Sequence, residues 1–263
     1  MAEASIPAPA RRPMTARDWG MLLLLGAIWG GSFFFARVAV VEIPPLNLVL
    51  FRVGIAALVL HLYLAVAGPS FRLAFPMAGS FFLLALVNNV VPFTLMFAGQ
   101  TALGAGAASI LNATTPFWTM ILANLLTDDE KLSWNKVAGV VLGMAGTVVM
   151  IGPGVLAGLG GPVWAKLALV GTALSYACAV LYARRFSALP PQVVATGQLT
   201  AATVIMVPVV LLWSGTDGLF SASPQAWASV LGLAVLATSF GYILFFALMR
   251  SAGATNTSLV TLI

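Results

Sequence analysis

The sequence predicts an all-α polytopic membrane protein, a ten-helix fold of two inverted five-helix repeats of which about eight and a half helices are present. Three observations predict this class. The 263 residues are 61% hydrophobic and 7% charged, with a mean hydropathy of +1.04, which excludes a soluble globular fold. The apolar residues form blocks close to the ~20 residues that a helix needs to cross a bilayer. The second half of the chain also repeats features of the first.

The first two helices are predicted over residues 17–41 and 46–66. Trp29 lies at mid-depth in the first helix beside small residues, which favour close helix packing or the lining of a pore. In the second helix, we expect Arg52 to snorkel or to pair with Glu42 or a helix end.

Two further helices are predicted over residues 81–98 and 105–126, joined by a turn of small residues. Each carries one proline and uncharged polar groups at mid-depth: Asn88, Asn89 and Pro92 in the first, and Asn112, Thr115 and Pro116 in the second. An unpaired amide in hydrocarbon costs about 1–3 kcal/mol or more, so these side chains should face a protein interior or a watery cavity. The two prolines are candidate hinges, because each removes a helical hydrogen bond.

The rest of the chain continues the pattern of apolar blocks separated by polar joints. We expect a disordered cytoplasmic tail at 1–16, a solvated polar run at 127–136, a short fifth helix at 137–151, a Gly/Pro-rich linker at 152–162, and helices at 165–186, 192–213 and 226–249. The segment after Arg250 begins a ninth helix but has only half the length of a span. The chain is therefore expected to be truncated there.

An internal repeat appears when the second half is shifted by 149 positions onto the first. The identical pairs are Leu84 with Leu233, Ala85 with Ala234, Leu95 with Leu244, Phe97 with Phe246, Ala98 with Ala247, Gly104 with Gly253, Ala105 with Ala254, and Ser109 with Ser258. We expect a first repeat at 17–151 and a second, incomplete repeat at 163–263. Because each complete repeat has an odd number of helices, the two would cross the bilayer in opposite senses.

Basic residues indicate the orientation. With a cytoplasmic N-terminus, the inner side carries Arg11, Arg12, Arg17, Arg72, Lys131, Lys136, Arg184, Arg185 and Arg250, and the outer side carries Arg37, Arg52 and Lys166. This excess agrees with the positive-inside rule. Because these residues sit singly at helix ends, the net charge of +5 does not indicate a nucleic-acid partner.

The sequence resembles the drug/metabolite transporter superfamily, specifically its EamA-type exporters. The resemblance rests on WGGSFFFARVAV and FRVGIAALVL, and above all on the stretch from ALGAGAASILNATTPFW through TDDEKLSWNK to the glycine-rich 137–151. It implies that Pro116 is the family proline, Glu130 the acidic loop residue and Arg52 the basic residue of the second helix. The chain departs in having Asp-Glu where Gly-Glu is usual, and it lacks the second proline and acid.

This resemblance favours an exporter of small metabolites, such as amino acids or related amphiphilic compounds, that works by alternating access through an uncharged aromatic and amide cavity. The candidate substrate-binding residues are Trp29, Asn88, Asn89, Asn112, Thr115, Trp118, Tyr176 and Tyr242, with Pro92 and Pro116 as hinges. Aromatic faces, amides and hydroxyls suit small zwitterions. Each polar group has the alternative of bonding only between helices.

Two other classes remain open: an integral-membrane enzyme, or a non-transporting receptor or assembly subunit. One His and one Cys cannot form a multi-ligand metal site, and the acidic run Asp128 to Glu130 lacks a second acidic cluster. We therefore expect no enzyme activity, no cofactor and no metal, with the cell (inner) membrane as the location and a monomer or homodimer as the assembly. No carboxylate lies within an apolar span, which favours facilitated diffusion or exchange over tight proton coupling.

The predicted topology is testable by labelling in a Cys178→Ser background. Arg72→Cys and Arg184→Cys should react with a membrane-impermeant thiol reagent from the same side of the bilayer, because an even number of predicted spans separates them. Arg37→Cys, one span away from the tail, should react from the other side. Reaction of the first two from different sides would contradict the two-repeat arrangement.

Overall fold

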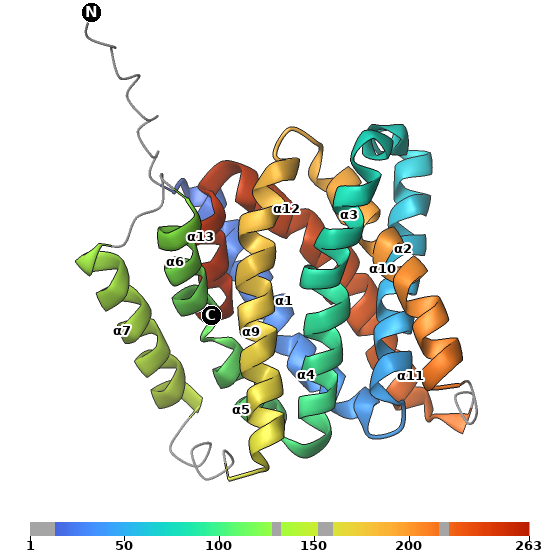
Figure 1. Cartoon of the computed structure of the whole chain (residues 1–263), viewed down its shortest axis with the longest axis horizontal. Coiled ribbons are helices and arrows are strands. Elements are labelled where there is room, and N and C mark those ends of the chain that lie inside the picture. The colour runs from blue at the N-terminus through green and yellow to red at the C-terminus, as the bar shows by residue number, and fades with distance from the viewer. Residues whose placement is uncertain (1–13, 128–132, 152–159, 216–220, 263) are drawn as a thin grey trace, which may run out of the picture.

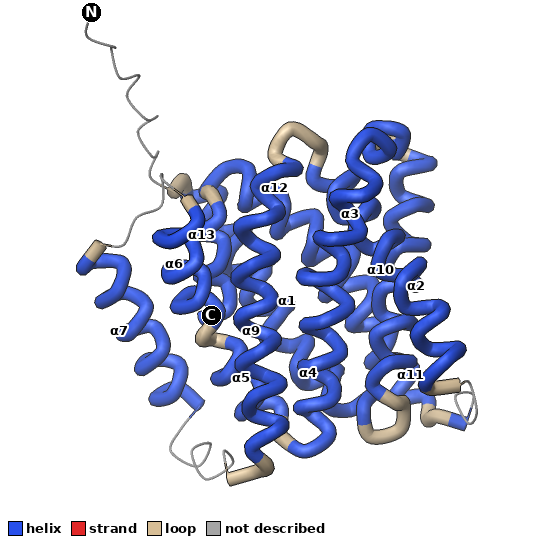
Figure 2. Tube along the Cα trace, viewed as in Figure 1, coloured by secondary structure: helices blue, strands red, loops and turns tan. Residues whose placement is uncertain are grey.

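A computed structural model describes residues 14–127, 133–151, 160–215 and 221–262, and all regular structure in these ranges is helical (Figures 1 and 2). The first half contains α1 (Ala16–Val40), α2 (Pro45–Val66), η1 (Phe71–Met77), α3 (Ala78–Ala85), η2 (Leu86–Val90), α4 (Val91–Ala102), α5 (Ala105–Asn112), α6 (Thr115–Leu126) and α7 (Trp134–Ile151). The second half contains α9 (Val163–Ala183), η3 (Arg184–Phe186), α10 (Pro191–Trp213), α11 (Pro224–Leu231), η5 (Gly232–Phe240), α12 (Gly241–Ala252), α13 (Ala254–Ser258) and η6 (Leu259–Leu262).

Six helical runs in these ranges are long and apolar enough to cross a membrane. They are Ala16–Val40, Pro45–Val66, Phe71–Ala102, Val163–Phe186, Pro191–Trp213 and Pro224–Ala252. Several predicted parts fall outside the described residues: most of the tail, the acids Asp128, Asp129 and Glu130, and most of the linker. The all-helical, polytopic membrane class predicted from composition is confirmed.

Two predicted helices differ from the structure. The sequence predicted one continuous helix over residues 105–126, whereas the structure divides them into α5 and α6 at Ala113 and Thr114. Pro116 explains the break, because its ring cannot donate the hydrogen bond that residue 112 would accept in a regular helix. The third predicted helix is longer than expected, since the run from η1 to α4 is nearly uninterrupted.

The two halves of the chain are interleaved. In the first half, α2 packs along α10, and α1 packs against α11 and α12. Helix α9 of the second half lies against α4, α5 and α6, so α4 and α6 do not pack along one another as a simple hairpin would (Figure 1). This interleaving leaves polar residues of both halves facing a common centre.

Three segments that carry basic residues predicted on the inner side lie at the same end of the bundle. Figure 1 shows the start of α1, the η1 segment with Arg72 and the end of α9 before Arg184 at the same end of the molecule. Asp18 joins the halves there by accepting a hydrogen bond from Ser251 Oγ at 2.5 Å. Glu42, in the loop between α1 and α2, accepts bonds from the backbone N–H and the hydroxyl of Ser223, which hold the pKa of that carboxyl below its ordinary value.

A close contact between α3 and α10 provides a stability test. A Cβ on Gly197 would lie 2.7 to 2.9 Å from ring atoms of Phe81, whose ring also packs on Phe186 with centroids 4.5 Å apart. Gly197→Ala should therefore lower the free energy of unfolding by about 1–3 kcal/mol, through overpacking. Thermal unfolding in detergent measures it. Gly79→Ala is the matched control, because its new methyl group meets nothing within 4 Å, and equal unfolding temperatures for the two variants would contradict the packing described here.

Candidate functional site

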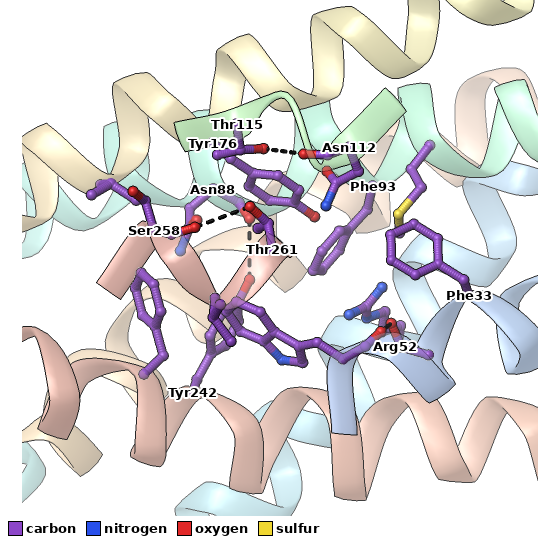
Figure 3. A pocket seen from close by; sticks show the side chains of 16 residues that line it. Phe33, Arg52, Asn88, Phe93, Asn112, Thr115, Tyr176, Tyr242, Ser258 and Thr261 are labelled. Carbon is purple, nitrogen blue, oxygen red and sulfur yellow. Dashed lines mark hydrogen bonds between the residues drawn. The ribbon is translucent and has the colours of Figure 1, made fainter. Parts of the chain in front are cut away.

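A central cavity of about 60 Å³ lies between the two halves (Figure 3). It is lined by Trp29, Ser32, Phe33, Arg52, Asn88, Phe93, Met96, Asn112, Thr115, Tyr176, Val180, Tyr242, Phe245, Ser258, Val260 and Thr261. These residues come from α1, α2, η2, α4, α5, α6, α9, α12, α13 and η6. The cavity is therefore built jointly by both halves of the chain.

The first polar wall forms at the π-turn η2, which lies within the continuous third span. Pro92 has no N–H to offer to the Asn88 carbonyl four residues earlier. The Tyr242 hydroxyl from α12 donates to that carbonyl at 3.1 Å, and Asn89 Nδ2 donates to the Tyr242 oxygen at 2.8 Å. The Asn88 side chain donates to Gln198 Oε1 at 2.9 Å. The backbone carbonyl that Pro92 leaves without a donor in one half thus accepts a hydrogen bond from a side chain of the other half.

The second polar wall is the break between α5 and α6. Pro116 leaves the backbone carbonyl of Asn112 without its helical donor, and the Thr115 hydroxyl donates to it at 2.6 Å. Figure 3 shows this bond beside the cavity. Asn112 and Thr115 are 7% and 1% exposed, and Asn112 Oδ1 has no hydrogen-bond partner among the residues described.

A third, aromatic wall of the cavity consists of Trp29 and the rings that contact it. Its indole nitrogen donates to the Ala237 carbonyl in η5 at 2.9 Å. Gly241 permits this approach, because a Cβ there would lie 2.7 Å from Trp29 Nε1. The indole meets Tyr242 edge-on, with centroids 6.1 Å apart, and Phe245 at 5.4 Å. Such rings present apolar surface with defined hydrogen-bonding edges.

The structure brings together six of the eight predicted binding residues: Trp29, Asn88, Asn112, Thr115, Tyr176 and Tyr242. Asn89 is fully buried behind the wall, where it supports Tyr242. Trp118 lies outside the lining and packs against Phe117, with centroids 5.4 Å apart. Both predicted hinge residues sit in the first turn of a helix: Pro92 is the second residue of α4, directly after the π-turn, and Pro116 is the second residue of α6, directly after the break.

Sequence reasoning missed Arg52, which it placed at the outer side or paired with Glu42. The structure instead buries Arg52 at the cavity, 4% exposed, while Glu42 bonds to Ser223. A signal was present, because a charged residue inside an apolar span is rare unless it faces a bundle interior. Also missed were Ser258 and Thr261, whose side chains reach the cavity from the C-terminal segment (Figure 3).

Comparison with known proteins identifies the class. The sequence model of the EamA-like transporter family matches residues 18–152 and again residues 163–263, so the chain belongs to this family. A solved crystal structure that is 18% identical superposes with a TM-score of 0.67, over 94% of this chain and 86% of that one, and shows the same fold.

Several curated relatives are similar along much of the chain. The uncharacterized inner membrane transporter YedA of Escherichia coli (strain K12) is 29% identical over 72% of this chain, which spans 60% of the length of YedA. A probable amino-acid metabolite efflux pump of Salmonella typhimurium is 27% identical, over 90% of this chain and 79% of its own length. A probable terminal-alkyne amino-acid exporter of Streptantibioticus cattleyicolor is 26% identical, over 93% of this chain and 80% of the length of that exporter. These relatives are named as transporters and exporters, not as enzymes.

The Tyr242 hydroxyl provides a test of how the cavity wall is held. Tyr242→Phe removes the donor to the Asn88 carbonyl and the acceptor for Asn89 Nδ2, and should lower stability by about 1–3 kcal/mol because buried polar groups lose their partners. The readout is thermal unfolding in detergent. Tyr63→Phe is the matched control, because Tyr63 is 40% exposed. Wild-type stability of Tyr242→Phe would show that these bonds do not hold the wall.

Proposed function

We propose that this chain forms the core of an exporter of small metabolites, amino acids or related amphiphilic compounds, which pass through the central cavity by alternating access. The two repeats would be residues 17–151 and 163–263, joined by the linker at 152–162. Support comes from the two separate matches to the family model and from relatives named as amino-acid exporters.

The observation that carries the proposal is the position of the cavity. It lies between the halves, and its polar groups sit at irregular points of the helices, at the π-turn η2 within the third span and at the break between α5 and α6. In transporters built from inverted repeats, substrate sites lie at the repeat interface and are formed by discontinuous helices. A cavity used only for packing would not require a π-turn and a helix break on its wall.

The hinges that alternating access requires can be placed at the same irregular points of the helices. The π-segments η2 and η5 are related by the 149-residue shift of the repeat, since Leu86–Val90 falls within Gly232–Phe240 after the shift. A π-segment, like a proline, loosens the regular helical ladder. We propose that Pro92 and Pro116 bend as the two repeats rock against one another.

The membrane arrangement completes the proposal. The chain is multi-pass, and YedA is named as an inner membrane protein. We propose a cytoplasmic N-terminus from the distribution of basic residues, and a monomer or homodimer in which each chain has its own cavity. Transport would proceed by facilitated diffusion or exchange, because His61 is engaged with Thr200 and Phe71 away from the cavity.

Flux through proteoliposomes tests this function. The purified chain should exchange radiolabelled amino acids across the bilayer faster than protein-free liposomes do, and Trp29→Ala and Asn112→Ala should lower the rate at least tenfold, which is about 1.4 kcal/mol at 25 °C. Matched controls are Trp164→Ala and Asn135→Ala, both at exposed positions.

Three results would count against it. Flux no faster than in protein-free liposomes would contradict transport. Wild-type rates in both cavity variants would contradict passage through this cavity. Flux that depends strictly on a pH gradient would contradict exchange.

A further inference from the structure

Arg52 lies at the cavity as a buried cation without an ion pair among the described residues. It is 4% exposed, and its Nε donates to Thr238 Oγ1 at 2.8 Å. Its Nη1 is buried and has no hydrogen-bond partner in the part of the chain that the structure describes. Figure 3 shows the side chain at the edge of the cavity near Phe93, whose ring centroid is 3.7 Å from the guanidinium carbon. The guanidinium is therefore incompletely satisfied.

This arrangement is costly for a purely structural residue. A guanidinium carries five N–H donors, and the charge loses its hydration when it is buried. The Phe93 face offsets part of that loss through a cation–π contact. It cannot accept a hydrogen bond in the plane of the fork, so Nη1 stays unpaired.

The bond to Thr238 does not account for the charge. The Thr238 hydroxyl donates to the Leu233 carbonyl at 2.7 Å, which leaves its oxygen to accept from Arg52 Nε. A neutral donor such as glutamine would serve that link between α2 and η5. The positive charge itself calls for an anionic partner.

The cavity lining indicates that this anionic partner is a solute that enters the cavity. Arg52 is the one charged residue among the described residues that line the cavity, and the others are aromatic, amide, hydroxyl or aliphatic. An anion entering the cavity would thus meet a single cation, with aromatic faces of Trp29, Phe33 and Tyr242 around it. A solute that carried only positive charge would be repelled.

We propose that Arg52 binds the carboxylate of the transported solute, so that the substrates are small carboxylates, zwitterionic or anionic, with an apolar or aromatic body. The fork of a guanidinium matches the two oxygens of a carboxylate, which would give Nη1 its missing acceptor. This inference rests on the proposed function, and it narrows the substrates to a chemical class.

Binding to the purified full chain tests the inference independently of flux. The probes are L-phenylalanine, L-leucine, L-threonine and phenylacetate, each beside the amide made from its carboxylate, titrated by calorimetry in detergent. At least one acid should bind tenfold or more tightly than its amide. Arg52→Gln should abolish this preference, and Arg52→Lys, which keeps the charge but loses the fork, should weaken acid binding several-fold and keep the preference.

The control is Arg37→Gln, because Arg37 lies outside the lining and donates to the Gln100 carbonyl at 2.6 Å. It should bind acids and amides as the wild type does. If Arg52→Gln does not fold, the Arg52→Lys result decides. The inference is overturned if no acid binds, or if acids and amides bind alike. It is also overturned if Arg52→Gln binds acids as tightly as the wild type does. If only Arg52→Lys folds, the same result for that variant overturns the inference.

Flux of the same solutes separates the two proposals. Acids that bind through Arg52 without crossing the bilayer would leave the carboxylate site standing and overturn export. Acids and amides that bind alike and cross alike would leave export standing and overturn the carboxylate site.

Discussion

Backbone polar groups in the middle of this bundle must find partners inside the protein, and the structure around the cavity depends on that constraint. Water cannot hydrogen-bond them at that depth, and an unpaired group is costly in lipid. Pro92 and Pro116 each free the carbonyl of an asparagine, Asn88 and Asn112 respectively. The Tyr242 hydroxyl satisfies the first and the Thr115 hydroxyl the second. Side-chain hydroxyls thus replace the backbone donors that the two prolines remove.

Several of these closures connect the two halves of the chain. Trp29 donates to the Ala237 carbonyl, Ser175 donates to the Val87 carbonyl at 2.7 Å, and Thr172 donates to the Pro92 carbonyl at 3.2 Å. Each bond joins a side chain of one half to a backbone carbonyl of the other. The shape of the cavity is thus tied to the relative position of the halves.

The positions of the charged residues also reflect the need of buried polar groups for partners inside the protein. Asp18 with Ser251, and Glu42 with Ser223, join the halves at the two ends of the bundle, where water is available. Arg52 is the exception, since it lies inside, between the Phe93 ring and the Thr238 hydroxyl. An interior charge is retained at a cost that packing alone does not explain.

Composition and local pattern were enough to predict the membrane class, the order of the helices and most of the polar residues at the cavity. The physical reason is local: apolar block length, helix breakers and mid-helix amides are readable along one segment, and lipid forces such amides inward. The sequence therefore placed Trp29, Asn88 and Tyr242 at the centre of the bundle. The repeat, read from spacing alone, also predicted that segments at Gly104 and Gly253 should correspond.

Which of the inward-facing groups share the cavity, and which bond behind it, depends on how the helices pack in three dimensions. Asn89 donates a hydrogen bond to Tyr242, and Trp118 packs on Phe117. Arg52 lies at the cavity rather than at the membrane interface or beside Glu42. These choices depend on the rotation of each helix and on α9 lying against α4, α5 and α6. Helix rotation is set by contacts between segments more than 100 residues apart, such as Asn88 with Gln198 and Arg52 with Thr238, which no local pattern specifies.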